Sequence, residues 1–107
     1  MNKPMTQERE VAILEKAIAT YGVKAQMLKS IEEMCELSQA LLKLVFSEWF
    51  ETGDCVEAVK HISEEMADVS IMLNQLTMIF GDPTEQEIEK LERLDSRLEA
   101  SCCDSAK

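Results

Sequence analysis

The sequence predicts an all-α fold, and its composition and patterning support this. Gly and Pro together supply only 5 of the 107 residues, and aromatic residues make up 5%. Folds rich in β-structure use more of these residues, in turns and in strands. Hydrophobic residues (46%) recur mainly at spacings of three and four, the period of an amphipathic helix. A chain of this length forms one domain, which we expect to span residues 1–100, with a disordered tail over residues 101–107.

Two helices are predicted in the N-terminal half. The first runs from about Thr6 to Tyr21, and Gly22 ends or bends it. The second runs from about Val23 into the forties. Its apolar stripe consists of Met27, Met34, Leu37, Leu41, Leu44 and Val45.

Two further helices are predicted in the C-terminal half. Asp54, with Glu57 three residues later, forms a capping box that opens the third helix. The apolar stripe of that helix consists of Val59, Ile62, Met66, Val69, Leu73, Leu76 and Phe80. After Gly81-Asp82-Pro83, a fourth helix continues to about Leu98. Its stripe consists of Ile88, Leu91, Leu94 and Leu98. Helices of these lengths with short connections predict a four-helix antiparallel bundle.

Charge and cysteine content narrow the classes of function. The formal net charge of -10 repels nucleic-acid backbones, so we expect no nucleic-acid partner. No signal-like N-terminal segment and no uncharged run of about 20 residues is present, so we expect a cytoplasmic protein without a membrane partner. Cys35 and Cys55 stand alone and Cys102 adjoins Cys103, which is not a zinc-ligand spacing. We expect these thiols to be reduced.

Two acidic motifs contain the candidate catalytic and metal-binding residues. The segment IEEMCEL contains Glu32, Glu33 and Glu36, and the segment SEEMADV contains Glu64, Glu65 and Asp68. On a helical wheel, each helix has one carboxylate pair three residues apart at the edge of its apolar stripe: Glu33 with Glu36, and Glu65 with Asp68. Glu32 and Glu64 point outward.

Packing of the two helices would bring four carboxylates together, and their mutual repulsion favours a hard divalent cation. Oxygen ligands of this kind select Mg²⁺, with Mn²⁺ as a substitute. A di-iron centre is rejected, because His61 is the only histidine and no Glu-x-x-His motif is present. Each acidic motif alone is also compatible with a solvated helix face.

The two motifs resemble a known signature. Glu32-Glu33-x-x-Glu36, followed after 28 residues by Glu65-x-x-Asp68, is similar to the E-E-x-x-E…E-x-x-D pattern of the all-α nucleotide pyrophosphohydrolases. The resemblance is greatest to the short MazG-like proteins, including phage-borne forms. It extends over EEMADVSIMLNQL and KLERLDSRL and covers roughly residues 21–99.

The resemblance implies an activity and a set of ligands. It implies Mg²⁺-dependent cleavage of a nucleoside triphosphate between the α and β phosphates, giving a monophosphate and pyrophosphate. Glu33, Glu36, Glu65 and Asp68 would be the metal ligands, and one of them or Glu32 would orient the attacking water. It also implies a homodimer or homotetramer.

Several residues are candidates for substrate binding. Lys29 lies one turn before Glu33, where it could balance the carboxylates or reach a phosphate. Lys90 and Arg93 occupy a helix in which the family places phosphate-binding residues, and pairing with nearby glutamates is the alternative. Asn74 and Gln75 follow the second acidic motif by about two turns. Three aromatic residues could stack on a base or anchor the core or a subunit interface: Phe46, Trp49 and Phe50.

Two alternatives stay open at this point. One is a noncatalytic helical module that assembles through its apolar stripes and presents acidic faces to a basic partner. The other is a pyrophosphohydrolase of another substrate, such as phosphoribosyl-ATP. Mg²⁺ should stabilise the fold of a metal-dependent enzyme measurably, whereas the noncatalytic module should respond only weakly. A substrate panel distinguishes a nucleoside triphosphate from another substrate.

Overall fold

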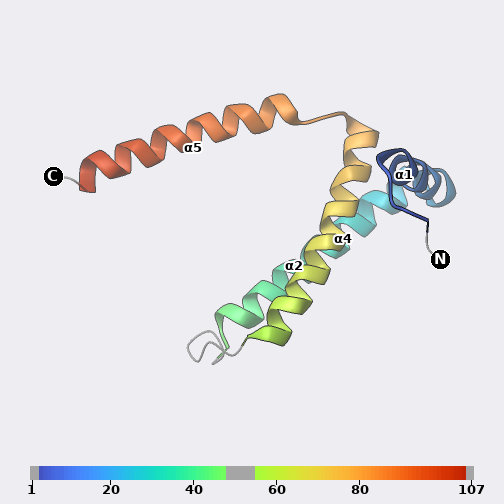
Figure 1. The fold of residues 1–107 in the computed structure, drawn as a ribbon, viewed down its shortest axis with the longest axis horizontal. Coiled ribbons are helices and arrows are strands. Elements are labelled where there is room, and N and C mark those ends of the chain that lie inside the picture. Colours follow the sequence, from blue (N-terminus) through green and yellow to red (C-terminus); the bar gives the residue numbers. More distant parts are fainter. Residues whose placement is uncertain (1–2, 48–54, 106–107) are drawn as a thin grey trace.

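The computed structural model describes residues 3–47 and 55–105, and over these ranges the chain is helical without strands (Figure 1). Its four helices are α1 (Gln7–Tyr21), α2 (Val23–Val45), α4 (Val56–Phe80) and α5 (Thr84–Ser105). The predicted all-α class is therefore confirmed, and the helix starts agree with the sequence pattern to within about two residues.

Specific residues set the ends of the first two helices. The hydroxyl of Thr6 accepts a hydrogen bond from the backbone N–H of Arg9 at 3.1 Å, which satisfies one free donor of the first turn of α1. Gly22 has a φ of 91° and separates α1 from α2, and its N–H donates to the carbonyl of Ile18 at 2.8 Å. A side chain would strain this backbone conformation, which explains the glycine.

The corner between α4 and α5 is defined by three residues. Gly81 has a φ of 108°, and its N–H donates to the carbonyl of Thr77 at 2.8 Å. A side-chain oxygen of Asp82 accepts hydrogen bonds from the backbone N–H of Thr84 at 3.1 Å and from its hydroxyl at 2.6 Å. These contacts end one helix and start the next at a fixed corner.

Two predicted helix boundaries need comment. The sequence pattern placed the end of the last helix near Leu98, whereas α5 continues to Ser105. No Gly or Pro follows Pro83, so nothing in the backbone chemistry stops the helix earlier. At the other boundary, α4 follows Cys55, and Asp54 of the predicted capping box lies outside the described residues.

The packed part of the chain is an antiparallel hairpin of α2 and α4, with α1 lying across one end of it (Figure 1). Helix α5 leaves this unit at an angle and packs against none of the other three helices. The radius of gyration is 18.5 Å, compared with about 13 Å for a compact domain of this length. Within a single chain, therefore, only three of the four described helices share a packed unit.

The face through which α2 and α4 touch is unusually polar. The buried apolar residues in the described ranges are Leu14, Ala40 and Met72. The buried polar residues are Gln26, Ser30, Glu33 and Gln75. The Gln26 side-chain amide donates to the Gln75 side-chain oxygen at 2.6 Å, which joins the two helices. This pairing allows the amides to be buried without a large loss of hydrogen bonding.

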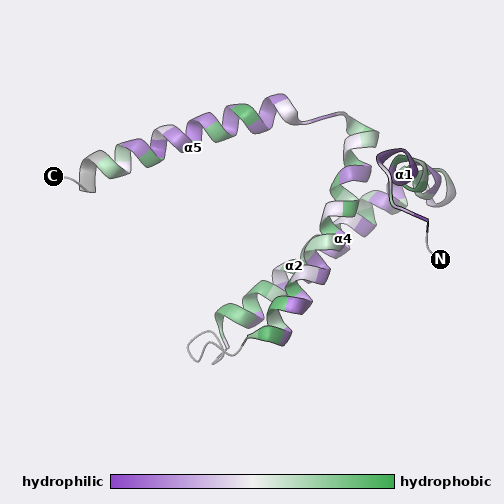
Figure 2. Ribbon diagram, in the orientation of Figure 1, coloured by the Kyte–Doolittle hydropathy of each residue, from purple (hydrophilic) through white to green (hydrophobic). Residues whose placement is uncertain are grey.

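The apolar stripes that the sequence suggested as core are largely exposed in the single chain. On α2 the exposed members include Met27, Met34 and Leu41, and on α4 they include Met66 and Leu73. Figure 2 shows hydrophobic and hydrophilic residues alternating along α5. Other members of the stripes are half-buried: Leu37 and Leu44 on α2, and Ile62, Val69 and Leu76 on α4. The stripes are therefore only partly buried within the single chain.

In the part of the chain that the structure describes, no helix combines the length and the apolar character that crossing a bilayer requires.

Candidate metal centre

Three of the predicted carboxylates converge where α2 and α4 pack. Glu33 and Glu36 stand one turn apart on α2, and Glu65 faces them from α4. One carboxylate oxygen from each residue lies within 4.8 Å of those from the other two. The i, i+3 spacing places the first pair on one side of α2, and the antiparallel pairing of the helices supplies the third member.

Two oxygens of this carboxylate cluster are buried without a partner. Glu33 is only 7% exposed, and its Oε2 atom has no hydrogen-bond partner among the described residues. The Oε2 atom of Glu65 is in the same state. An unsatisfied buried carboxylate oxygen is costly, and in native proteins it calls for a missing water, proton or ion.

Two side chains with basic nitrogens border the cluster. The Lys29 ammonium lies 3.1 Å from Glu33 Oε1 and 3.6 Å from Glu32 Oε1. His61 Nε2 lies 3.9 Å from Glu65 Oε1. The hydrogen bond to Glu33 and the charges of Glu32 and Glu33 raise the pKa of Lys29, so this side chain stays protonated. One lysine is too little to neutralise the carboxylates around it.

The negative charge that Lys29 leaves uncompensated affects the pKa of Glu36. The charge of Glu33 raises that pKa above its usual value, and burial, a hydrogen bond to Glu33 and the charge of Glu65 act in the same direction. Proximity of like charges therefore costs free energy at this site when all three groups ionise.

The cluster fits a hard divalent cation. Its donors are all carboxylate oxygens, the ligand type that Mg²⁺ and Mn²⁺ prefer. Bond lengths near 2.1 Å place two oxygens on one Mg²⁺ between about 3.0 and 4.2 Å apart. The three carboxylate oxygens lie within 4.8 Å of one another, so small side-chain movements would bring them to one ion. Glu33 and Glu65 each have an unpartnered oxygen available. The residues present can hold Mg²⁺.

The structure places the other predicted acidic residues outside this cluster. Asp68, expected as a fourth ligand, is exposed and is not among the three grouped carboxylates. Its side chain is one methylene shorter than that of glutamate, so it reaches less far from α4. Glu32 is exposed and touches Lys29, and Glu64 is exposed, as the helical wheel predicts for both.

The predicted substrate-binding residues are divided between the site and other surfaces. Lys29 adjoins the cluster. Asn74 instead donates to Glu10 Oε1 on α1 at 3.2 Å, and Gln75 is buried in its bond with Gln26. Lys90 and Arg93 are on α5, which does not reach the cluster of its own chain. Arg93 pairs with Glu89 at 3.3 Å, the alternative role considered for it.

Of the three aromatic candidates, the structure describes only Phe46, which is 82% exposed. Trp49 and Phe50 lie outside the described residues.

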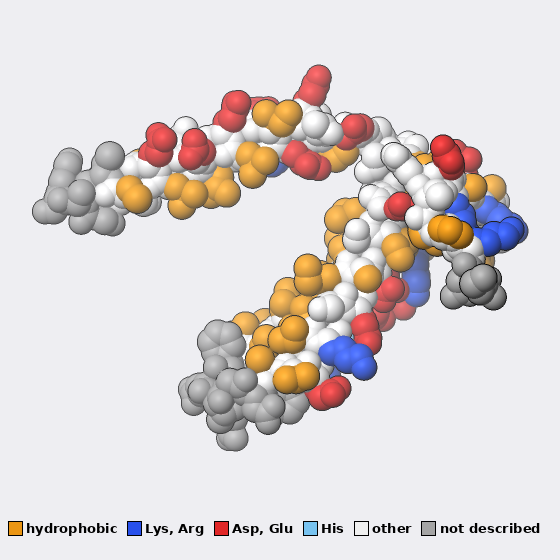
Figure 3. Space-filling model, in the orientation of Figure 1, with side chains coloured by type: hydrophobic (Ala, Val, Ile, Leu, Met, Phe, Trp, Pro, Cys, Tyr) orange, Lys and Arg blue, Asp and Glu red, His pale blue; other side chains and the backbone are white. Residues whose placement is uncertain are grey.

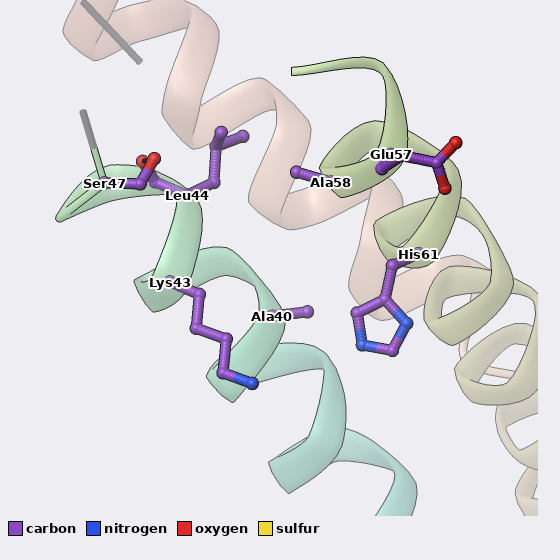
Figure 4. Close-up of a pocket in the computed structure, with 7 residues that line it drawn as sticks. All are labelled: Ala40, Lys43, Leu44, Ser47, Glu57, Ala58 and His61. Atoms are coloured by element: carbon purple, nitrogen blue, oxygen red, sulfur yellow. Dashed lines mark hydrogen bonds between the residues drawn. The ribbon is translucent and has the colours of Figure 1, made fainter. Parts of the chain in front are cut away.

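A cavity of about 320 Å³ opens beside the cluster, between the C-terminal end of α2 and the start of α4 (Figure 4). Lys43 and His61 project into the space between the two helices, whereas the carboxylate of Glu57 points away from it. The cavity is lined by Ala40, Lys43, Leu44, Ser47, Glu57, Ala58 and His61. His61 borders both this cavity and Glu65, so the two features are adjacent.

Sequence reasoning missed the buried amide pair and the placement of His61 between cluster and cavity. Gln26, Ser30 and Glu33 follow one another at spacings of four and three on α2, which marks a face of that helix. Because all three are polar, the pattern indicates solvent exposure, and only the pairing with α4 makes it a buried face.

Comparison with known proteins found no matching family model, and neither a curated protein nor a solved structure matches the chain.

Proposed function

We propose that this chain is a Mg²⁺-dependent nucleoside triphosphate pyrophosphohydrolase whose metal site is formed by Glu33, Glu36 and Glu65. The observation that carries the proposal is the convergence of these carboxylates from two helices, with two buried oxygens that have no partner. The nucleotide substrate comes from the resemblance of the two acidic motifs to the MazG-like pattern.

The chemistry follows from the charges at the site. A bound Mg²⁺ would neutralise the triphosphate and act as a Lewis acid at its phosphoryl oxygens. Glu33, Glu36 and Glu65 would hold the ion. A carboxylate oxygen that does not ligate, or Glu32, would orient the attacking water and accept its proton. Cleavage between the α and β phosphates then gives a monophosphate and pyrophosphate.

The surroundings of the cluster are suited to a nucleotide. Lys29 stands within 3.6 Å of two glutamates, where its ammonium can also meet a phosphate oxygen. The cavity beside His61 is at the lower end of the size range of small-molecule sites, and a base or sugar could enter it. Lys90 and Arg93 would take part only if α5 of another copy brought them there.

A homodimer or homotetramer is part of the proposal, and so is the four-helix antiparallel arrangement, which this chain would complete with helices of a second copy. The reduced, cytoplasmic setting expected from the sequence suits an enzyme that acts on the nucleotide pool.

The test is a panel of ribo- and deoxynucleoside triphosphates, with phosphoribosyl-ATP included, incubated with and without Mg²⁺. Release of pyrophosphate together with the monophosphate, only when Mg²⁺ is present, is the expected result, and the panel ranks the substrates. Release of single phosphates would contradict the assigned bond. Absence of turnover in a folded, Mg²⁺-supplied protein would favour the noncatalytic module.

A further inference from the structure

A second cavity lies on the other side of the carboxylate cluster from the one beside His61. Its residues on α2 precede Glu33, whereas those of the cavity beside His61 follow Glu36. It has a volume of about 490 Å³, within the size range of small-molecule sites. The lining comes from three helices: Ala17 and Tyr21 of α1, Ala25, Gln26 and Lys29 of α2, and Met72 and Gln75 of α4. We call this space the amide cavity.

Lys29 connects the amide cavity to the carboxylate cluster. It lines the cavity, and its ammonium lies 3.1 Å from Glu33 Oε1. Gln26 precedes Glu33 by seven residues, which is two helical turns, or about 10 Å along the axis of α2. This distance is comparable to the length of a nucleoside monophosphate. A nucleotide with its phosphates at the cluster can therefore reach into the amide cavity with its base.

Two buried amides in this cavity have hydrogen-bonding capacity that the protein does not use. Gln26 is 7% exposed and Gln75 is 4% exposed, and one hydrogen bond joins them, from Gln26 Nε2 to Gln75 Oε1. Gln26 Oε1 has no hydrogen-bond partner in the part of the chain that the structure describes. Gln75 Nε2 donates only to the Met72 sulfur at 4.0 Å, and a thioether is a weak acceptor. Buried amides with free groups indicate a ligand or water.

The free groups are suited to the edge of a nucleobase. Together they offer one acceptor and one donor, and the pairing edge of each common base carries neighbouring donor and acceptor atoms. Tyr21 is 67% exposed at the cavity, where its ring can stack on the face of a base. The cavity beside His61 lacks such groups among its lining residues, since its polar side chains are exposed or half-buried.

The charge around the amide cavity also favours an anionic ligand. The chain as a whole has a net charge of -10, but residues 3–29 carry five basic and three acidic side chains. Figure 3 shows basic side chains over the α1 end of the molecule, next to acidic ones along the hairpin. Local positive charge attracts an anion toward the surface on which it lies. A nucleotide therefore meets less repulsion at this end of the molecule.

We propose that the amide cavity binds the nucleobase of the substrate, with Gln26 and Gln75 hydrogen-bonded to its edge and Tyr21 stacked on its face. The inference rests on the proposed function, because it takes the phosphates to lie at the carboxylate cluster. It goes further by assigning the base to one of the two cavities and by naming the residues that recognise it. Lys29 then lies between the base and the metal site.

The experiment compares ligands with and without a base. Titration calorimetry with Mg²⁺ measures the Kd of α,β-imido nucleoside triphosphates, which resist cleavage at that bond, and of tripolyphosphate, which has no base. Gln26→Met/Gln75→Met should raise the Kd of the nucleotides about 10-fold or more and leave that of tripolyphosphate unchanged. Gln39→Met removes an exposed amide of α2 that lines neither cavity, and should bind both ligands as the parent does.

A second variant keeps the proposal testable if the double variant unfolds. Tyr21 is exposed, so Tyr21→Ala should fold as the parent does. Loss of stacking should raise the Kd of the nucleotides about 5-fold or more, again without effect on tripolyphosphate. Folded variants that bind nucleotides as the parent does, or that lose affinity for both ligands equally, would overturn the assignment of the base.

Photolabelling locates the base directly. A nucleoside triphosphate with an azido group on its base should label residues 17–29, and unmodified nucleotide should prevent this. Label confined to residues 40–47 or 57–61 would place the base in the cavity beside His61 and reject the proposal. A parent that binds tripolyphosphate as tightly as nucleotides would overturn this inference alone. A parent that binds neither ligand would overturn the proposed function as well.

Discussion

Three carboxylates that lie close together without a cation repel one another, and in this chain the effect reaches Glu36 most directly. The charge of Glu33 raises the pKa of Glu36, and no basic side chain is paired with it among the described residues. Neutralising this residue relieves repulsion and removes a ligand in the same step. Stability and metal binding therefore change in opposite directions, a common pattern at functional sites.

We expect Glu36→Gln to raise the melting temperature of the metal-free protein and to abolish the further rise that Mg²⁺ produces in the parent. Loss of a ligand should weaken Mg²⁺ affinity by about 100-fold or more. Thermal unfolding with EDTA and with Mg²⁺ measures both effects. Glu64→Gln removes an exposed carboxylate from the same protein and should retain the full Mg²⁺ response. Equal losses in both variants would contradict the assigned cluster.

The raised pKa of Glu36 also gives a pH dependence of definite sign. Between the ordinary value of 4.5 and the raised pKa of Glu36, the folded protein holds a proton that the unfolded chain has released. Metal-free stability contributed by this group should therefore fall as pH rises from 4.5 through the raised pKa. Because Mg²⁺ competes with that proton, its stabilising effect should grow over the same interval. Melting curves at several pH values test this, and Glu36→Gln should flatten both trends.

The pairing of α2 with α4 is polar where most helix pairs are apolar, and this determines how it responds to substitution. Gln26 and Gln75 are buried and share a hydrogen bond of 2.6 Å. Removing one amide leaves the other without its partner, which costs more than the bond itself contributes.

Gln75→Met should lower the free energy of unfolding by about 1–3 kcal/mol, because the Gln26 amide then stays buried and unsatisfied. Adding Gln26→Met should recover most of that loss, since two thioether side chains pack without polar groups. Denaturant unfolding of the parent, both single variants and the double variant completes the cycle. Additive losses would show that the two amides act independently.

The junction of α1 and α2 depends on a backbone conformation that only glycine adopts without strain. Gly22 has φ 91° and ψ 155°, and a Cβ placed there meets nothing within 4 Å. Strain alone should therefore make Gly22→Ala destabilising, by about 1–3 kcal/mol. Lys24→Ala, at an exposed helical position nearby, should change stability by less than about 0.5 kcal/mol. Chemical denaturation compares the two, and equal effects would exclude the strain argument.

At the scale of the whole molecule, the apolar surface left by the fold matters more than its small intrachain core. Leu14, Ala40 and Met72 are the buried apolar residues of the described ranges. Such a core contributes little, and small domains often gain their stability by assembling. We therefore expect the melting temperature to rise with protein concentration. A concentration-independent transition would argue that the single chain is stable alone.

The helices could be predicted from the sequence because the residues that begin and end them act locally. Thr6, Gly22 and Gly81 end or begin helices through their own backbone and side-chain chemistry. Glu33 and Glu36 could be paired from their spacing, and Glu65 from its matching motif. The absence of Asp68 from the cluster depends on side-chain reach across two helices, which spacing along one helix does not determine. The polar hairpin contact and the free α5 depend on tertiary packing, where apolar periodicity marks a buried face without naming its partner.

The most direct test of the central claim compares Mg²⁺-dependent pyrophosphate release by the parent, Glu65→Gln and Glu64→Gln. These two glutamates are neighbours on α4, but only Glu65 belongs to the carboxylate cluster. We predict that Glu65→Gln lowers release by about 100-fold or more, whereas Glu64→Gln stays close to the parent. Release that survives in Glu65→Gln, or falls equally in both variants, would contradict a metal site formed by Glu33, Glu36 and Glu65.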